Sequence, residues 1–179
     1  MIAVIVGTNR VDSRSKLIAE HYTGRLSEIT DEEVKMLPLE NIKGPLLVDN
    51  KYKAESQSTE LAEIQNNYFI AADRWIIVIP EYNGGLPGVF KSLIDAMSIR
   101  EYGATFTDKK VALVGVSAGK AGNARGLDYL TNLLSYVKAN VFRNRLPISQ
   151  IETLIKDNTL VEEKTLEAID LQLKEFLAY

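Results

Sequence analysis

The sequence predicts an α/β fold in which a parallel sheet is covered by helices on both faces. Short apolar runs alternate with stretches of helical spacing along the 179 residues, and this alternation is typical of consecutive βαβ units. The runs 2–6, 75–79 and 111–117 are almost entirely apolar, as expected for strands that are buried on both faces. With no internal repeat and no linker, a chain of this length is expected to form a single domain, residues 1–179.

The first strand is expected at 2–6, where five apolar residues precede a polar loop. Because no basic flank comes before this run and polar residues follow at once, we do not expect it to be a signal peptide. Residues 13–29 place apolar side chains on one side of a helix. The run 33–37 predicts a shorter, weaker strand that ends at Pro38.

The middle of the chain begins with a long connection. Residues 40–55 contain Gly44-Pro45 and many polar groups, which predicts an irregular segment, and connections of this length often have a function. The sequence leaves open whether this segment acts as a lid. A helix at 60–72 then leads into the third strand at 73–79.

The second half repeats the alternation. Helices are expected at 86–99 and 123–137, and strands are expected at 111–117 and 140–143. The last helix is expected to begin with a capping box formed by Thr159 and Glu162. Because crossovers between parallel strands are right-handed, five strands of this kind suit a flavodoxin-like three-layer sandwich with strand order 2-1-3-4-5.

Composition excludes several classes of function. Lys and Arg number 21 against 24 Asp and Glu, a net charge of -3, so no basic excess indicates a nucleic acid or an anionic membrane as partner. No window approaches the about 20 apolar residues of a membrane span. The absence of cysteine removes disulfides and thiolate nucleophiles and fits a cytoplasmic protein. The only histidine, His21, cannot build a multi-histidine metal site or a Ser-His-Asp triad, so neither a metal nor a catalytic side chain is assigned.

The loop that joins the first strand to the first helix has the chemistry of a phosphate site. Free N–H groups at a helix start stabilise an anion, and Arg10 adds a planar guanidinium group that is always charged and suits a phosphate. Further hydroxyl donors come from Thr8, Ser13 and Ser15. The loop lacks the later glycines of a dinucleotide fingerprint and the ending of a Walker loop. Helix capping alone would explain its Ser and Asp residues equally well.

The loop after the third strand, residues 80–88, is the most informative segment. Three glycines allow a close approach of the backbone to a flat ligand, and two prolines restrict the loop's shape. Its backbone groups can bind the edge of a planar heterocycle while Tyr82 or Leu86 covers a face. Glu81 is a candidate general base, but a structural role in the loop is favoured because no His or Cys lies near it in the sequence.

The loop after the fourth strand, residues 117–123, carries two more glycines. In the predicted strand order, this loop and the two described above open into one crevice at the carboxyl edge of the sheet. One anion site beside two glycine-rich loops indicates a mononucleotide with a large planar ring, and FMN satisfies that description.

These motifs resemble the NADPH-dependent FMN reductase family, which includes azobenzene, quinone and chromate reductases. Residues 7–15 resemble its G-[ST]-x-R-x-x-S-x-N phosphate loop, and residues 80–88 resemble its P-E-Y-N-x-x-x-P-G signature. Residues 117–122 are similar to its looser third flavin loop. Two positions depart from the family pattern: Ser15 stands where Asn is usual, and Ala96 stands where Trp is frequent.

The resemblance implies bound FMN, NADPH or NADH as co-substrate, and reduction of a small acceptor such as a flavin, quinone, azo compound or metal oxyanion. It also implies a homodimer or homotetramer. A flavodoxin-like electron carrier or a non-catalytic flavin-binding protein remains an alternative. By position, the implied FMN-binding residues are Thr8, Arg10, Ser13 and Ser15 for the phosphate, Pro80, Glu81, Tyr82, Asn83 and Gly84 for the ring and ribityl chain, and Ser117 and Gly119 for the other edge of the ring.

Overall fold

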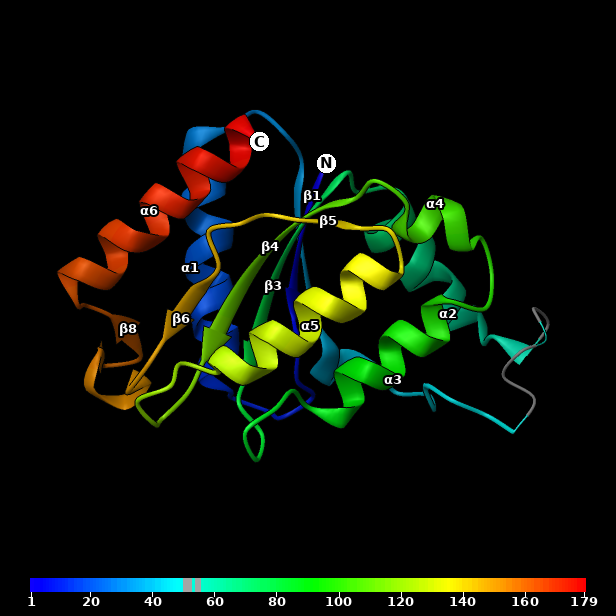
Figure 1. Ribbon diagram of the computed structural model, residues 1–179, viewed down its shortest axis with the longest axis horizontal. Coiled ribbons are helices and arrows are strands. Elements are labelled where there is room, and N and C mark those ends of the chain that lie inside the picture. The colour runs from blue at the N-terminus through cyan, green and yellow to red at the C-terminus, as the bar shows by residue number, and fades with distance from the viewer. Residues whose placement is uncertain (50–52, 54–55) are drawn as a thin grey trace.

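The protein is described by a computed structural model that covers residues 1–49, 53 and 56–179. Its main sheet has the path β2-β1-β3-β4-β5, with all neighbouring strands parallel, which confirms the predicted order. The strands are β1 (Ile2–Val6), β2 (Val34–Pro38), β3 (Arg74–Pro80), β4 (Lys110–Val116) and β5 (Asn140–Val141). Helices cover both faces of this sheet (Figure 1), which makes the three-layer sandwich.

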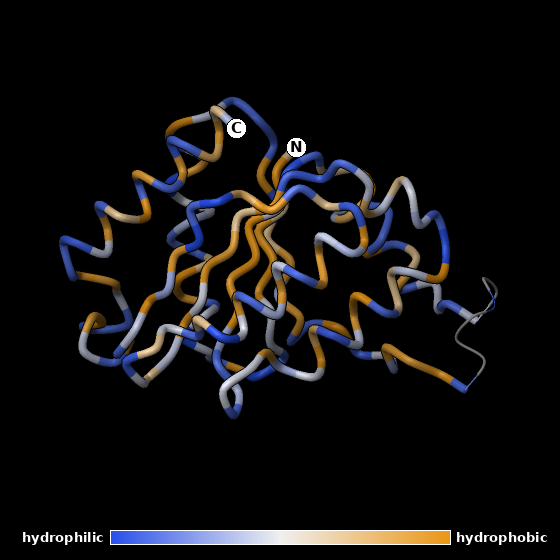
Figure 2. The backbone as a smooth tube through the Cα atoms, viewed as in Figure 1, coloured by the Kyte–Doolittle hydropathy of each residue, from blue (hydrophilic) through white to orange (hydrophobic). Residues whose placement is uncertain are grey.

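Two separate hydrophobic cores lie on the two faces of the sheet. Successive side chains of a strand point to opposite faces, so Trp75 and Ile77 of β3 belong to one core, and Ile76 and Val78 belong to the other. Figure 2 shows the central strands as a continuous hydrophobic band. The first core is covered by α2 (Thr59–Ile64), α3 (Gly88–Met97), α4 (Tyr102–Phe106) and α5 (Ala124–Tyr136), and the second by α1 (Arg14–Ile29) and α6 (Glu163–Ala178).

The fifth strand position is filled by two short strands. β5 pairs with the beginning of β4, and β6 (Leu146–Ile148) pairs with its end at Val114–Val116. The predicted strand 140–143 therefore covers only the first of these pieces. β6 was missed because three residues that include a proline give almost no strand signal.

The predicted capping box at the start of the last helix is wrong. Thr159 lies in β8 (Thr159–Leu160), which forms a small antiparallel hairpin with β7 (Ile155–Lys156). The turn of this hairpin, Asp157-Asn158, has positive φ at both residues, the conformation that two-residue hairpins favour and that Asp and Asn tolerate. The N-cap of α6 is instead Glu162, whose carboxylate accepts a hydrogen bond from the Thr165 N–H at 2.7 Å.

The predicted helix 60–72 begins as α2 and continues as a π-helical turn over Gln65–Ile70. Gln65 lies buried in that turn and donates from Nε2 to the Met97 carbonyl at 2.9 Å and to Thr105 Oγ1 at 2.7 Å. In the connection before α2, Glu60 accepts hydrogen bonds from the backbone of Lys43 and Gly44. Part of the segment 40–55, for which the sequence left a role as a lid open, lies outside the described residues: positions 50–52 and 54–55.

Among the described residues, no helix combines the length and apolar character that crossing a membrane requires.

Candidate functional site

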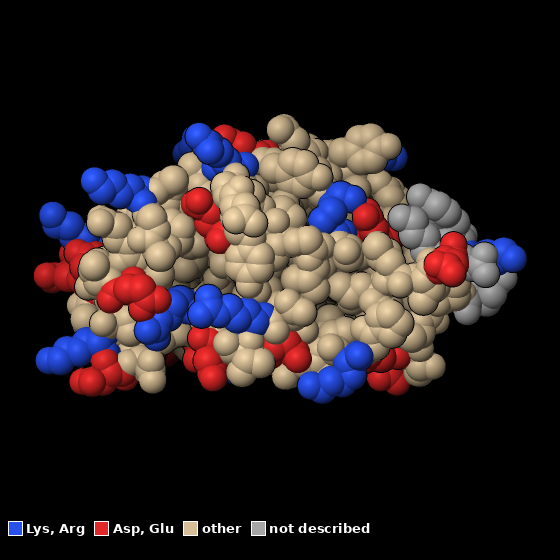
Figure 3. Space-filling view, turned by 90° about the horizontal axis from the view of Figure 1, so that it is seen from below, with Lys and Arg blue, Asp and Glu red and all other residues tan. Residues whose placement is uncertain are grey.

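The three predicted loops meet at the carboxyl edge of the sheet, the lower edge in Figure 1. Thr8 Oγ1 of the first loop is hydrogen-bonded to Tyr82 Oη of the second at 2.9 Å. Asn123, where the third loop enters α5, donates from Nδ2 to the carbonyls of Ile79 and Pro80 at 3.2 and 2.9 Å. The convergence expected from the strand order is thereby confirmed. Figure 3 views the molecule from this edge and shows uncharged surface with charged side chains of both signs around it.

A cavity of about 150 Å³ lies between the first and second loops and the end of β4. Its lining includes eight predicted site residues: Thr8, Arg10, Ser13, Ser15, Pro80, Glu81, Tyr82 and Ser117. Asn83, Gly84 and Gly119 do not line it. Asn83 and Gly84 form the tip of the second loop, where Tyr82 and Gly85 exchange two backbone hydrogen bonds of 3.0 Å. A role for these three residues in binding a ligand stays a prediction.

Two serines at the start of α1 have different roles. Ser13 is the N-cap, and its Oγ accepts a hydrogen bond from the Lys16 N–H at 3.2 Å. Ser15 is only 1% exposed and lines the cavity, and its Oγ has no hydrogen-bond partner among the described residues. A buried hydroxyl without a partner lowers the stability of the folded state. This hydroxyl is therefore suited to donate a hydrogen bond to a ligand. The capping interpretation is confirmed for Ser13, and the binding of a phosphate by this loop stays a prediction.

Arg10 and Glu81 line the cavity, and neither side chain makes a hydrogen bond to another residue that the structure describes. The Arg10 backbone N–H donates to Thr8 Oγ1 at 3.2 Å, whereas its exposed guanidinium makes no hydrogen bond to another described residue. The Glu81 backbone N–H donates to the Val116 carbonyl at 2.9 Å, which ties the second loop to β4. This contact involves only the backbone of Glu81, so the structural role favoured for its side chain stays a prediction.

The third loop is held by its own serine. Ser117 donates from Oγ to the Gly119 carbonyl at 2.9 Å and accepts from the Gly122 N–H at 3.0 Å. Both contacts remain inside the loop, so the Ser117 hydroxyl stabilises the turn. The suggested contacts of Ser117 and Gly119 with a flavin ring stay predictions.

Sequence reasoning missed the residues that position the second loop. Asn123 is 1% exposed and adopts positive φ of 61° at the start of α5, a conformation that Asn tolerates. Its side chain needs the space beside Gly126, and the loop before it needs the space beside Gly115. A Cβ on Gly126 would lie 2.2 Å from Asn123 Oδ1, and a Cβ on Gly115 would lie 2.2 Å from the Gly122 carbonyl oxygen. The only local signal was the Asn-x-x-Gly spacing at 123–126.

Sequence reasoning also missed an ion pair at the cavity. Arg14, in the first turn of α1, donates from Nη2 to Glu152 Oε2 at 2.8 Å, and both residues line the cavity. Glu152 lies in the short helical turn Ile151–Thr153 after β6. The hydrogen bond from Arg14 lowers the pKa of Glu152 and raises the pKa of Arg14, so the carboxylate is ionised at neutral pH.

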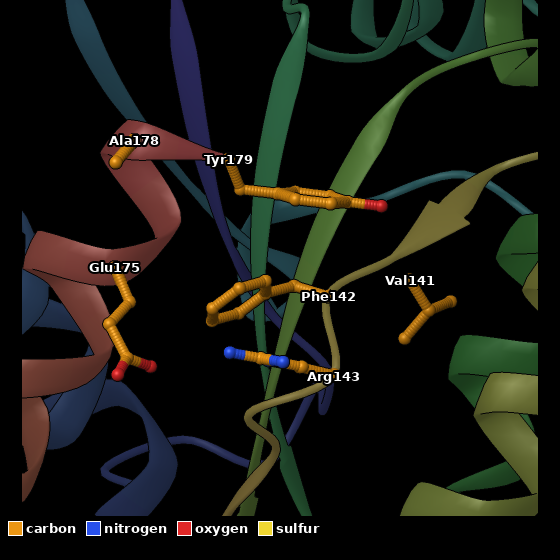
Figure 4. A pocket seen from close by; sticks show the side chains of 6 residues that line it. All are labelled: Val141, Phe142, Arg143, Glu175, Ala178 and Tyr179. Carbon is orange, nitrogen blue, oxygen red and sulfur yellow. The ribbon is translucent and has the colours of Figure 1, made fainter.

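A larger cavity of about 480 Å³ lies at the opposite edge of the sheet, between the β5 end and the end of α6 (Figure 4). Its lining residues are Val141, Phe142, Arg143, Glu175, Ala178 and Tyr179. β5 pairs with the first two residues of β4, whereas the three loops follow the ends of their strands. None of the predicted site residues lines this second cavity.

No group of three or more His, Asp or Glu side chains in the described part of the chain is arranged to hold a metal ion. His21 lies partly buried on α1, and burial lowers its pKa.

Comparison with known proteins places the chain in one family. A family model described as NADPH-dependent FMN reductase matches residues 1–153. The chain is 28% identical over 181 residues to the 2-hydroxy-1,4-benzoquinone reductase of Burkholderia sp, covering 99% of this chain and 94% of that protein. It is 26% identical over 181 residues to the NADPH azoreductase of Bacillus sp. (strain OY1-2), covering 99% and 91%.

Solved structures show the same fold. The flavoenzyme NAD(P)H:(acceptor) oxidoreductase FerB of Paracoccus denitrificans superimposes with a TM-score of 0.80 at 23% identity, covering 99% of this chain and 95% of that chain. The family match runs without interruption through the three loops that meet at the cavity. The chain therefore belongs to the NADPH-dependent FMN reductase family.

Proposed function

We propose that this oxidoreductase passes electrons from NADPH or NADH through bound FMN to a small acceptor of the quinone or azo class. The observation that carries the proposal is the buried, unpartnered Ser15 hydroxyl beside the start of α1, in a cavity that the first and second loops share. The two acceptor classes are those in the names of the benzoquinone reductase and azoreductase relatives.

The residues around the cavity fit the phosphate of FMN. Within the described part of the chain, the Ser15 hydroxyl and the Arg10 guanidinium have no hydrogen-bond partner and can donate to a ligand. The start of α1, with its free N–H groups, lies at the same cavity. Since the cavity measures about 150 Å³, it suits the phosphate end of the cofactor, and the open surface along the second loop would take the ring. When bound, FMN supplies the capacity to accept a hydride and to release electrons to the acceptor.

The chain's own contribution is to position the ligand. Thr8 holds Tyr82 by its hydroxyl, and Asn123 holds the carbonyl of Pro80, so the wall of the second loop is set before a ligand arrives. Preorganised donors and dipoles lower the cost of reorganisation during a reaction. No side chain of the site needs to form a covalent bond with the substrate.

The proposal is tested by the absorption spectrum of the purified protein, reconstituted with FMN and mixed with NADPH or NADH under argon. We expect the two visible flavin bands to fade within one turnover and to return when a benzoquinone or an azo dye is added. In an electron carrier or a non-catalytic flavin protein, the flavin bands would fade slowly or not at all after NADPH or NADH is added. Failure to bind FMN at all would contradict the proposal.

Replacing Ser15 by Ala separates ligand binding from folding. Removal of a buried, unpartnered hydroxyl is expected to leave the free energy of unfolding of the apoprotein unchanged or to raise it by up to about 1 kcal/mol. The same change is expected to weaken FMN binding about tenfold, because it removes a hydrogen bond to a charged phosphate. Urea unfolding of the apoprotein and FMN fluorescence titration measure the two effects. A variant that loses stability and keeps its FMN affinity would show that Ser15 is a structural residue.

Assembly into a homodimer or homotetramer and a cytoplasmic location are also proposed, as expected from the resemblance and the composition. Assembly is supported by exposed tyrosines on one side of the molecule, Tyr129 and Tyr136 of α5, since exposed aromatic surface is common at interfaces.

A further inference from the structure

A carboxylate lies at the phosphate end of the cavity, where it is unexpected. Glu152 lines the same cavity as Arg10, Ser13 and Ser15, which are the groups that suit an anion. The phosphate of FMN carries close to two negative charges near neutral pH, because its second pKa is about 6. An ionised glutamate at this position opposes the binding of that phosphate.

Glu152 already occupies donors that a phosphate would use. Arg14 Nε lies 3.1 and 3.0 Å from the two carboxylate oxygens of Glu152, and Nη2 lies 2.8 Å from Oε2. The third nitrogen, Nη1, donates to Asn158 Oδ1 at 3.1 Å, in the turn of the β7–β8 hairpin. The guanidinium at the first turn of α1 is therefore directed toward the segment after β6.

A phosphate could replace the Glu152 carboxylate as the partner of Arg14 at a small cost in free energy. The side chains of Arg14 and Glu152 are 37% and 56% exposed, and ion pairs with this exposure are weak because water competes for both charges. The positive charge of Arg10 also acts on Glu152. A dianionic ligand therefore competes with a single carboxylate for the same two arginines.

We propose that Glu152 weakens the affinity of the phosphate site for FMN: its carboxylate binds Arg14 and repels the phosphate of FMN, so that bound FMN can exchange with free FMN. The Glu152 carboxylate thus competes with the FMN phosphate for Arg14, and it does not affect binding of the flavin ring. This inference rests on the proposed function, because it assumes that the cavity receives the phosphate of FMN.

The test compares FMN with riboflavin, which has the same ring and no phosphate. In Glu152→Gln the shape and one hydrogen-bond acceptor are kept and the charge is removed. FMN is expected to bind about tenfold more tightly, the effect of a unit charge about 6 Å from a dianion in exposed surroundings. Riboflavin affinity is expected to stay unchanged. The gain for FMN should shrink at high salt, since exposed charges are screened.

The chain offers a matched control on the same helix. Arg25 of α1 binds Asp170 of α6 through Nε and Nη2 at 2.9 and 3.1 Å, and neither residue lines the cavity. Asp170→Asn is expected to leave the affinities for FMN and riboflavin unchanged. Glu152→Ala is a second variant, which removes the carboxylate without leaving an amide and is expected to change the affinity in the same direction.

The outcomes separate this inference from the proposed function. An unchanged or lowered ratio of FMN to riboflavin affinity in both Glu152 variants would overturn the role of Glu152, while wild-type binding of FMN would leave the proposed function intact. A wild-type protein that binds neither flavin would overturn the proposed function itself. A raised ratio in the Glu152 variants, with Asp170→Asn unchanged, supports both.

Discussion

Replacing Arg10 by Ala is expected to raise the dissociation constant for FMN by about 10- to 100-fold, because a hydrogen bond to a charged group contributes about 1.5–3 kcal/mol. The Arg10 guanidinium lines the cavity and makes no hydrogen bond to another described residue. The free energy of unfolding of the apoprotein is therefore expected to change by less than about 0.5 kcal/mol. Fluorescence titration with FMN and urea unfolding of the apoprotein measure the two quantities.

Arg143 provides the control for this variant. It is also an exposed arginine whose side chain has no hydrogen bond to another described residue, and it lies at the second cavity, at the opposite edge of the sheet (Figure 4). Arg143→Ala removes the same charge from the molecule and is expected to leave FMN affinity within about twofold. Equal FMN affinity in Arg10→Ala and in the wild type would remove Arg10 from the phosphate site.

A single methyl group on Gly115 is expected to lower the free energy of unfolding by about 1–3 kcal/mol, the range of overpacking in a filled core. Gly115 lies in β4, and its added Cβ would lie 2.2 Å from the Gly122 carbonyl oxygen and 3.2 Å from Asn123 Cβ. Because one of these atoms is backbone, the start of α5 must move. That movement displaces Asn123 from the carbonyls of Ile79 and Pro80, so FMN binding is expected to weaken as well.

The same substitution at Gly24 is the control, and it should have the opposite sign. Gly24 lies in the interior of α1, and no atom lies within 4 Å of the Cβ that Ala would add. Since Gly destabilises a helix interior by about 0.5–1 kcal/mol relative to Ala, Gly24→Ala is expected to stabilise the protein by that amount. Urea unfolding with an unchanged m-value checks both variants. A Gly115→Ala protein as stable as the wild type would show that loop and helix adjust without cost.

Several errors in the predicted elements share one cause, which is competition between local signals. Thr159 and Glu162 match a capping box, but the Asp157-Asn158 turn pairs Thr159 with Lys156 in a hairpin, and Glu162 caps the helix alone. The helix expected from residue 86 begins at Gly88, because Pro87 fixes the conformation of the residue before it.

The meeting of the three loops at one edge of the sheet was predicted correctly, because the topology rule that joins them depends only on strand order. What the sequence did not show was how the hydroxyls divide their tasks. Ser13 and Ser15 are two residues apart and chemically alike, yet Ser13 accepts from the Lys16 N–H and Ser15 has no partner. Their hydrogen bonding differs because the two hydroxyls lie on different sides of the first turn of α1.

Local patterns in the chain were sufficient for the alternation of strands and helices, the order of the sheet and the three loops at its carboxyl edge. These features follow from apolar periodicity and turn chemistry, which act between neighbours in the sequence. Folding in three dimensions determined the partners of each side chain. Arg14 meets Glu152 across 138 positions of sequence, and Asn123 meets Pro80 across 43. Such pairs form because packing of the layers brings distant segments together, and no short-range pattern records which atoms will then lie within hydrogen-bonding distance.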